Sequence, residues 1–494
     1  MTDRQTMALV LIAAPALVGG LLWCLPRRWV APAAVTGAVI TGTLAVTVAA
    51  TALTDPGHPQ AGTWVALDAA GGLLVGVVGV VGMVSVLASP AYLATAGDPA
   101  AGHGRRQRTY FAVLYAFWAL LLAVPVAGNL GAAWLLVEAT TAASALLVGF
   151  SGKARALEAG WKYLILTSLG LGIALFGVAL VAAGVPGGGL GMLSWGVLST
   201  YGAGPQTALV AYLLLVAGLA AKIGLAPVHN WLPDAHSEAP APVSAMLSAA
   251  LLPAVLLVAW RCEQGLAPVI RPGAAQAVLI GFGLVSIAVA VPFLSRPLAW
   301  KRLLAYSSLE HMGVITLGIG FATPLAMAGV AIHIVGHAIA KTLGFCAVTP
   351  LLAHEPGAAG HPVTGIARTQ PALGATVALS LGTLSGLPPS PLFVSELLVI
   401  SGGFQSGRPW VAATAALLLA LAFIGLVRAL LEATLGESAG RARRLDPRGT
   451  PRLAGLRGLT VLTAAALVLL LILGGASVWL PASDLVQALL KGVG

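Results

Sequence analysis

The feature that most constrains this chain is a succession of long apolar runs with almost no charge inside them. A transmembrane helix needs about 20 consecutive apolar residues to cross the hydrocarbon core of a bilayer. The chain is 58% hydrophobic and 9% charged, whereas a soluble domain has about 25% charged residues. These values exclude a soluble globular protein and a disordered chain. They predict an all-α, polytopic membrane protein.

The runs predict about 14 transmembrane helices within a single membrane domain, residues 1–494. Little chain is left over for a soluble catalytic domain. The first run is longer than the apolar core of a signal peptide, so we expect it to be retained as a span. The predicted spans cover residues 7–23, 31–53, 71–92, 110–127, 130–150, 161–183, 207–225, 240–260, 274–293, 304–321, 325–350, 371–400, 410–431 and 459–480.

Basic residues are distributed unevenly between alternate connections. One set of connections holds 17 of the 26 Lys and Arg residues, and the other set, with the termini, holds 5. The positive-inside rule assigns the basic set to the cytoplasm and both termini to the outer side. The net charge of +10 follows from this topology and does not indicate a nucleic-acid partner. The outer set comprises Arg4, Arg261, Arg271, Arg408 and Lys491, and the basic set includes a cluster at 437–457.

The seventh and twelfth predicted spans are interrupted by Gly and Pro. Both contain Gly-Leu-x-Pro, at 224–227 and 386–389. Proline removes a backbone donor, and in lipid the freed carbonyls must find partners inside protein or beside water. The breaks lie five spans apart, so their surroundings have opposite orientations, as in inverted repeats with discontinuous helices at a transport site. Two ordinary proline kinks are the alternative. The break residues are Gly224, Pro227, Gly386, Pro388 and Pro389.

Several ionisable residues lie inside the predicted spans. A charge at the bilayer centre costs at least about 2.5–3.5 kcal/mol, so such residues are functional candidates. Burial drives lysine and glutamate toward their neutral forms, whereas a Glu–Lys pair keeps both charged. A row of these groups, bridged by water, can therefore act as a switchable proton wire. The candidates are Glu138, Lys162, Lys222, Glu310, His311, His333, His337, Lys341 and Glu396, and the spacing of four places His333, His337 and Lys341 on one helix face.

Structural roles remain open for part of this set. A buried Lys–Glu pair can act as structural glue, Lys162 can extend to the headgroups, and His333 can be a hydrogen-bonded core residue. Glu310 and His311 can tie their span to a neighbour.

The three cysteines, at 24, 262 and 346, have no metal-ligand or redox spacing. The sequence therefore predicts no metal site, no cofactor and no redox centre in this chain.

Residues 222–245 form the most specific motif of the chain. This stretch resembles the signature of the proton-conducting antiporter-like subunits of respiratory complex I and of Mrp cation/proton antiporters. Further similarities are Val137-Glu138 and the segments 303–313, 337–341 and 386–396. Segments 160–166 and 305–313 are more similar to component F of hydrogenase-4, found in formate hydrogenlyase-like complexes.

The resemblance implies two inverted five-helix repeats, residues 110–262 and 274–434, with half-channels joined by a polar axis. It implies that Glu138 and Lys222 are the charged pair of the first repeat, that His337 and Lys341 contribute to the axis, and that Glu396 ends it. It also implies a prokaryotic cytoplasmic (inner) membrane and other membrane subunits as partners. Redox partners would be iron–sulfur and nickel–iron subunits or NADH dehydrogenase-like subunits. The signature adds His229, Asp234 and His236 as supporting residues.

The chain departs from the family pattern in the span 240–260. Pro253 occupies the place where the family often has a lysine or another polar group. A proton path there needs water or another side chain, or else it is interrupted. The sequence thus favours a proton- or sodium-translocating, antiporter-like subunit of a membrane-bound redox complex. The alternatives are a secondary cation/proton antiporter, the membrane half of an inorganic-carbon uptake system, and a non-conducting scaffold.

Overall fold

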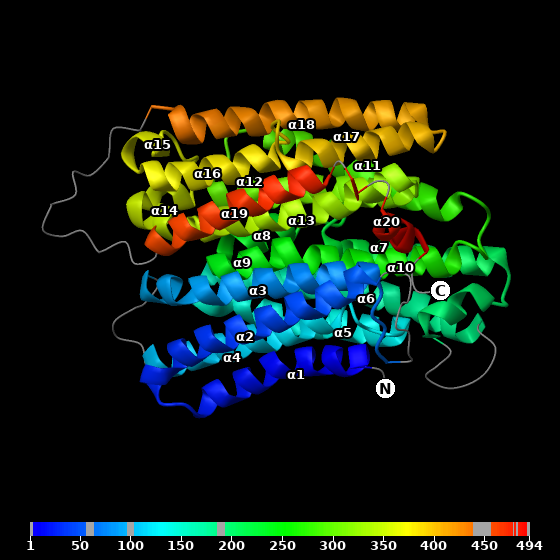
Figure 1. Ribbon diagram of the computed structural model, residues 1–494, viewed down its shortest axis with the longest axis horizontal. Coiled ribbons are helices and arrows are strands. Elements are labelled where there is room, and N and C mark those ends of the chain that lie inside the picture. Colours follow the sequence, from blue (N-terminus) through cyan, green and yellow to red (C-terminus); the bar gives the residue numbers. More distant parts are fainter. Residues whose placement is uncertain are drawn as a thin grey trace, which may run out of the picture.

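The computed structural model describes residues 3–55, 64–95, 103–184, 193–437, 456–477, 479–480 and 483–491. In these parts the chain is almost entirely helical, and its β-type contacts are isolated bridges such as Val65–Ala127 and Asn129–Ser194. The predicted all-α class is confirmed. Long helices lie side by side along one axis (Figure 1). Most of the basic cluster predicted at 437–457 falls outside the described residues.

The helices follow the predicted spans closely. Five of the long helices carry proline at their first position, where the missing N–H needs no partner (α7, α13, α16, α17 and α18). The helices are α1 Asp3–Cys24, α2 Arg27–Thr54, α3 Ala69–Thr95, α4 His103–Ala123, α5 Leu130–Val148, α6 Ala154–Gly184, α7 Pro205–Ile223, α8 Leu232–Glu238, α9 Ala241–Met246, α10 Leu252–Leu266, α11 Ala274–Leu294, α12 Trp300–Phe321, α13 Pro324–Cys346, α14 Val348–His354, α15 Ile366–Thr369, α16 Pro371–Leu384, α17 Pro391–Gln405, α18 Pro409–Leu435, α19 Leu456–Ala476 and α20 Asp484–Lys491.

Among the described residues, 11 helices are long and apolar enough to cross a membrane, so the chain is a multi-pass membrane protein. The predicted number of 14 is not confirmed by this criterion. Two of the shorter apolar helices, α16 and α17, are the halves of the interrupted twelfth span. The beginning of α1 and the end of α20 lie at the same end of the bundle (Figure 1).

The core is centred on two elements. The segment Ala241–Leu266, which joins α9 to α10 through the π-helix Leu247–Leu251, has every residue of its most apolar window buried. In the segment Pro324–His354, which contains α13, 89% of the residues in the most apolar window are buried. The corresponding value for Gly458–Ala476 in α19 is 17%. Polar side chains carried by α9, α10 and α13 are therefore shielded from lipid by the other helices.

Both predicted breaks are present, and their backbone groups find partners within the protein. α7 ends at Ile223 and is followed by Gly224, whose φ of 77° is in the left-handed region that glycine adopts without strain. The indole of Trp231 donates a 2.7 Å hydrogen bond to the carbonyl of Ala221, in the last turn of α7. At the second break Gly386 has a φ of 67°, and its N–H bonds to the carbonyl of Thr383 at 3.0 Å. The breaks therefore meet the requirement for non-helical backbone at membrane depth.

Candidate functional site

Lys222 is fully buried at the end of α7 and has a tyrosine as its partner. Its ammonium donates a hydrogen bond to the hydroxyl of Tyr163 on α6 and lies 4.4 Å from the centre of that ring. The Tyr163 hydroxyl also contacts Ser144 Oγ on α5 at 2.7 Å. The three helices are thus joined by one polar cluster in an apolar core.

Glu138, the predicted partner of Lys222, is bound elsewhere. Its Oε1 accepts a 2.7 Å hydrogen bond from Ser168 on α6, and its Oε2 has no hydrogen-bond partner among the described residues. Glu138 is still close enough to act electrostatically on Tyr163 and Lys222. The geometry places Tyr163 as the group that contacts Lys222 directly, and the predicted charged pair stays a prediction.

Aromatic rings and a histidine continue from this cluster toward the second half of the chain. The ring of Trp231 lies 4.7 Å from Tyr163 and 6.5 Å from His236, and His236 stacks on Phe345 of α13 at 5.5 Å. His236 is fully buried, and both of its ring nitrogens lack a partner in the described structure. It is also near enough to Lys341 to interact electrostatically. His236 therefore contacts aromatic rings from both halves of the chain, but no hydrogen bond in the described structure links it to either lysine.

Lys341 and three histidines form the second cluster. The Lys341 ammonium donates to the carbonyl of Leu304, at 2.5 Å, and to the hydroxyl of Ser307, both on α12. His337 lies one turn before Lys341 on α13, and its ring is 5.3 Å from that of His311 on α12. The cluster has four titratable side chains, and all of them are fully buried: His311, His333, His337 and Lys341.

A hydrogen-bonded chain extends from this cluster to α17. His311 Nδ1 lies 3.0 Å from His333 Nε2, and His333 Nδ1 lies 2.8 Å from Ser395 Oγ. Each histidine in such a chain can accept a proton on one nitrogen and donate one from the other. Ser395 directly precedes Glu396, which is partly exposed. The chain therefore brings a buried histidine row to the edge of the second break.

Glu310 and Glu396 come together beside His311. One ligand-type atom from each of the three residues lies within 4.8 Å of the other two. Glu310 Oε2 is 3.3 Å from His311 Nδ1. The Glu396 carboxyl lies close to Gly386. A Cβ added to Gly386 by substitution would be 2.9 Å from Glu396 Oε2. The second break and its carboxyl are therefore packed against each other.

Three predicted residues, Lys162, Asp234 and His229, lie outside this buried row. The ammonium of Lys162 is half exposed, 2.5 Å from Glu158 and 3.7 Å from Asp234. Asp234 also pairs with Arg302 at 2.7 Å. These four residues form a surface ion-pair network. His229 lies in the first break, is half-buried, and has an unpartnered Nδ1 within the described residues.

Pro253 lies one residue into α10, directly after the π-helix, and is buried. Nearby, Ser248 Oγ of the π-helix contacts Ser308 Oγ of α12 at 2.7 Å. This contact provides a polar group on the same buried segment as Pro253. Whether a proton path passes Pro253 stays a prediction.

Sequence reasoning missed two features of the polar core. One is Tyr163, which has a signal in the sequence: Thr167 follows one turn later, so a polar stripe runs along an apolar helix. The other is a buried ion pair of 2.8 Å between Asp68, just before α3, and Arg261 of α10. Arg261 was assigned to an outer connection, but it is 2% exposed and lies within the helix.

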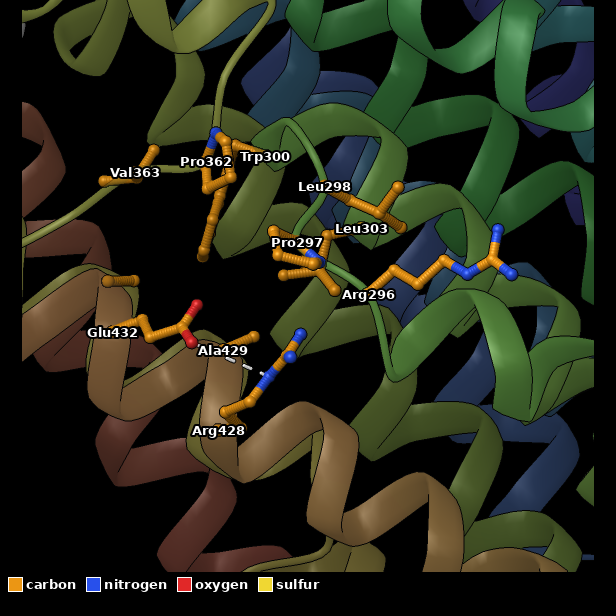
Figure 2. Close-up of a pocket in the computed structure, with 11 residues that line it drawn as sticks. Arg296, Pro297, Leu298, Trp300, Leu303, Pro362, Val363, Arg428, Ala429 and Glu432 are labelled. Carbon is orange, nitrogen blue, oxygen red and sulfur yellow. Dashed lines mark ion pairs between the residues drawn. The ribbon is translucent and has the colours of Figure 1, made fainter.

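One small pocket lies apart from the row. It is bounded by the connection before α12, by residues 362–363 and by α18, where Arg428 pairs with Glu432 (Figure 2). Its volume of about 20 Å³ has room for about one water molecule. The pocket is thus too small for an organic substrate, and none of the predicted translocation residues lines it.

Residues 127–422 match the membrane-domain family described as "NADH:quinone oxidoreductase/Mrp antiporter, TM". The chain belongs to this family. The matched region contains every residue of the buried row, from Glu138 to Glu396. The predicted resemblance is confirmed.

Among relatives, a hydrogenase-4 component F homologue of Methylacidiphilum infernorum is 34% identical over 63% of this chain. A subunit N of NADH-quinone oxidoreductase from Desulforudis audaxviator is 29% identical over 75% of this chain and 73% of its own length. An uncharacterised Mycobacterium tuberculosis protein is 32% identical to this chain. The match covers 66% of the length of the Methylacidiphilum protein and 53% of the length of the Mycobacterium protein. The chain thus spans less than two thirds of the length of each of these two relatives.

The fold is shared with a chain of respiratory complex I from Thermus thermophilus. The two structures superpose with a TM-score of 0.79 over 98% of this chain and 100% of that chain, at 22% sequence identity. At this level of identity the likeness shows the fold alone. It supports the polytopic, all-helical architecture independently of the sequence motifs.

Proposed function

We propose that this chain is the ion-translocating, antiporter-like subunit of a membrane-bound redox complex of the hydrogenase, formate hydrogenlyase-like or complex I-like type. The observation that carries the proposal is the buried row from Lys222 through His236 and Lys341 to His333. The names of the relatives, a hydrogenase-4 component and an NADH-quinone oxidoreductase subunit, support a redox assembly. The chain itself would carry protons or sodium ions, and partner subunits would hold the redox centres.

The chemistry of the row suits proton transfer. Buried lysines exchange their proton readily when a partner moves, whereas arginine stays charged. Histidines relay protons through two nitrogens. Moving one charge across 100 mV costs about 2.3 kcal/mol, so the redox reaction must supply at least that much per proton. A change in the distance between Lys222, Tyr163 and Glu138 would switch the first lysine between its charged and neutral forms.

The topology that goes with this function has 14 crossings and both termini on the outer side of a prokaryotic cytoplasmic membrane. Within it, residues 110–262 and 274–434 form the inverted repeats, each containing one broken helix. The location of both chain ends at one end of the bundle supports an even number of crossings (Figure 1). Around Pro253, His236 and the Ser248–Ser308 pair would carry the proton together with water.

The test is to purify the complex through a tag on this chain, identify its subunits and measure redox-driven proton uptake in proteoliposomes. Lys222→Ala should lower the uptake rate by at least about tenfold, equivalent to about 1.4 kcal/mol, with assembly retained. Lys162→Ala is the matched control. Its ammonium is half exposed, and surface pairs contribute only about 0–1 kcal/mol, so uptake should stay near the wild-type rate.

A secondary cation/proton antiporter is the second candidate, and the inclusion of Mrp antiporters in the matched family favours it. It predicts that redox subunits are absent from the purified material and that transport proceeds without a redox substrate. A coupled complex that keeps full uptake after Lys222→Ala would instead point to a non-conducting scaffold.

A further inference from the structure

Arg428 is a charged residue on the exposed side of the membrane-spanning helix α18. It lies in a stripe of positions spaced alternately four and three residues apart, which form one face of a helix. The Arg428 side chain is 39% exposed. The other members of the stripe are apolar and 42–63% exposed, and they are Leu417, Leu421, Ile424, Leu431 and Leu435. A guanidinium in such a stripe is unfavourable in a membrane unless an anion or water accompanies it.

The guanidinium of Arg428 has few acceptors within the protein. Its Nε and Nη2 are buried and have no hydrogen-bond partner among the described residues. The carboxylate of Glu432, one turn further along α18, lies 3.7 Å from Nε, which is too long for a hydrogen bond. Arg428 points from α18 toward the connection that precedes α12, beside the small pocket (Figure 2). Two donors are therefore available to an acceptor at this pocket.

The charged residues that line the pocket have one excess positive charge. Arg296 and Arg428 are its cations, and Glu432 is its anion. Arg296 is exposed, and its side chain extends away from Arg428, so it contributes positive charge without sharing the pocket (Figure 2). A ligand with a single negative charge would balance the group. A guanidinium binds phosphate oxygens particularly well, because its planar fork matches their geometry.

The position of Arg428 along α18 matches the depth of lipid phosphates. Trp410, in the first turn of the same helix, is 86% exposed, and tryptophan is enriched at membrane–water interfaces. Arg428 follows 18 positions later, which corresponds to about 27 Å of helix. The hydrocarbon core of a bilayer is about 30 Å thick. With Trp410 at one interface, Arg428 lies just inside the other, and its long side chain can extend to the headgroups.

We propose that Arg428 binds the phosphate of an anionic phospholipid, with Arg296 adding positive charge beside it. The pocket admits about one water-sized group, so the phosphate would lie at its mouth with one oxygen inside. The acyl chains would lie on the apolar stripe, next to Leu421 and Ile424, toward the bilayer centre.

A phospholipid is the occupant that uses both features of this surface. A free anion would leave the apolar stripe uncovered, and an apolar helix of a partner would leave the guanidinium unpaired. In the proposed topology this end of α18 faces the cytoplasmic leaflet, where basic pockets between helices bind anionic headgroups. The site itself does not depend on the translocation function.

The experiment titrates the purified, delipidated complex with phosphatidylglycerol and counts the bound lipids by native mass spectrometry. Arg428→Gln should remove one saturable lipid per copy of this chain, or weaken its binding by at least about tenfold. Phosphatidylcholine has the same phosphate but no net charge, so it should bind several-fold more weakly at this site. Arg302→Gln is the matched control, because the Arg302 guanidinium is 50% exposed but already paired with Asp234 at 2.7 Å. Its lipid binding should equal that of the wild type.

Glu432→Gln tests the same site in the opposite direction. The change removes the negative charge beside Arg428, so phosphatidylglycerol should bind several-fold more tightly. A merely structural ion pair between Arg428 and Glu432 predicts something else: both changes would lower the thermal transition of the complex equally and leave lipid binding unchanged. Glu432→Gln also decides the matter if the Arg428 variant does not assemble.

Other results would overturn the proposal. Equal phosphatidylglycerol binding by the wild type and Arg428→Gln would exclude the site. Displacement of the lipid by inorganic phosphate alone would identify a site for a free anion. If Arg428→Gln released a neighbouring subunit and kept its lipid, a carboxylate of that partner would be the occupant. Because lipid binding is measured without turnover, the translocation function can stand or fall independently of these results.

Discussion

At the scale of the residue, the contact between Lys222 and Tyr163 changes how the first half of the polar row should be understood. The hydroxyl of Tyr163 is the direct partner of the ammonium, and the same hydroxyl reaches Ser144. Glu138 is held by Ser168 on the other side. Each of the two residues is therefore hydrogen-bonded to a neutral hydroxyl group, and no direct contact between them is present among the described residues. A small displacement of Tyr163 would alter the interaction between them.

Tyr163→Phe tests this arrangement. The change removes one hydroxyl and leaves the ring that packs under Lys222, so we expect a modest loss of stability, about 1 kcal/mol. Redox-driven proton uptake should fall several-fold, because the ammonium loses its hydrogen-bond acceptor. Tyr115→Phe is the control: the Tyr115 hydroxyl bonds to the Ala34 carbonyl at 2.5 Å, far from the row. Equal effects of both changes on uptake would argue against a specific role for Tyr163.

Gly386 offers a second test at this scale. Its φ of 67° disfavours any residue with a Cβ, and a Cβ would lie 2.9 Å from the Glu396 carboxyl. Gly407→Ala has the same backbone cost at a φ of 73°, but its Cβ would meet nothing within 4 Å. We expect both alanine variants to lose about 1–2 kcal/mol of stability. Only Gly386→Ala should also reduce proton uptake, and uptake lost equally in both variants would contradict this expectation.

At the scale of the element, the helices approach one another through glycines. On α11 a Cβ at Gly283 would lie 2.8 Å from the carbonyl of Gly313 on α12, so the two backbones are in contact there. Gly281 lies two residues earlier on the same helix, and a Cβ there would meet nothing within 4 Å. Small residues at helix crossings allow close packing in membranes, where the hydrophobic effect does not drive helix association.

Gly283→Ala should therefore separate α11 from α12, with a loss of about 1–3 kcal/mol, typical of overpacking. Gly281→Ala should be neutral or slightly stabilising, because alanine favours the helix. The measurement is the thermal transition of the purified complex, followed for both variants under identical conditions. A transition lowered to the same extent in both variants would exclude the crossing as the cause.

The two helix breaks show how far the sequence leads at the scale of the element. Gly-Leu-x-Pro predicted both interruptions, because proline and glycine act locally. The intramembrane lysines, glutamates and histidines were also recognised, since each is conspicuous in an apolar run. The partners of these residues were not predictable. The choice of Tyr163 over Glu138 depends on how α5, α6 and α7 pack, and no local pattern encodes this.

At the scale of the whole molecule, the pair Asp68–Arg261 joins parts of the chain that are far apart in sequence. It connects the start of α3 to α10 across 193 positions, and no sequence pattern linked the two residues. Arg261 also contacts the Ala127 carbonyl and lies 5.6 Å from the ring of Trp195. The carboxylate of Asp68 receives the N–H of Gly71 at 2.7 Å. Both partners thus make hydrogen bonds beyond the ion pair, although Arg261 Nε has no partner among the described residues.

Arg261→Ala should destabilise the protein by about 3–5 kcal/mol, because it leaves Asp68 as an unpaired buried charge. The double variant with Asp68→Ala should be less damaging than the sum of the two single variants. Arg4→Ala removes a more exposed ion pair, with Asp55 at 3.0 Å, and should have an effect below about 1 kcal/mol. Thermal unfolding of the purified complex measures all of these changes. Additivity of the Asp68 and Arg261 variants would show that the pair does not couple α3 to α10.

The same ion pair restricts how ions can cross the protein. Transporters that alternate between two open states need one half of the molecule to swing against the other. Here α10 belongs to the fully buried centre and is fastened to α3 by a buried charge pair that would be expensive to separate. Under the proposed function, such a framework would conduct without large motions, and the protonation of side chains would control the flow of ions. Its gates would then be sought in rotations of single residues, and freezing large motions by cross-links between α3 and α10 should leave conduction intact.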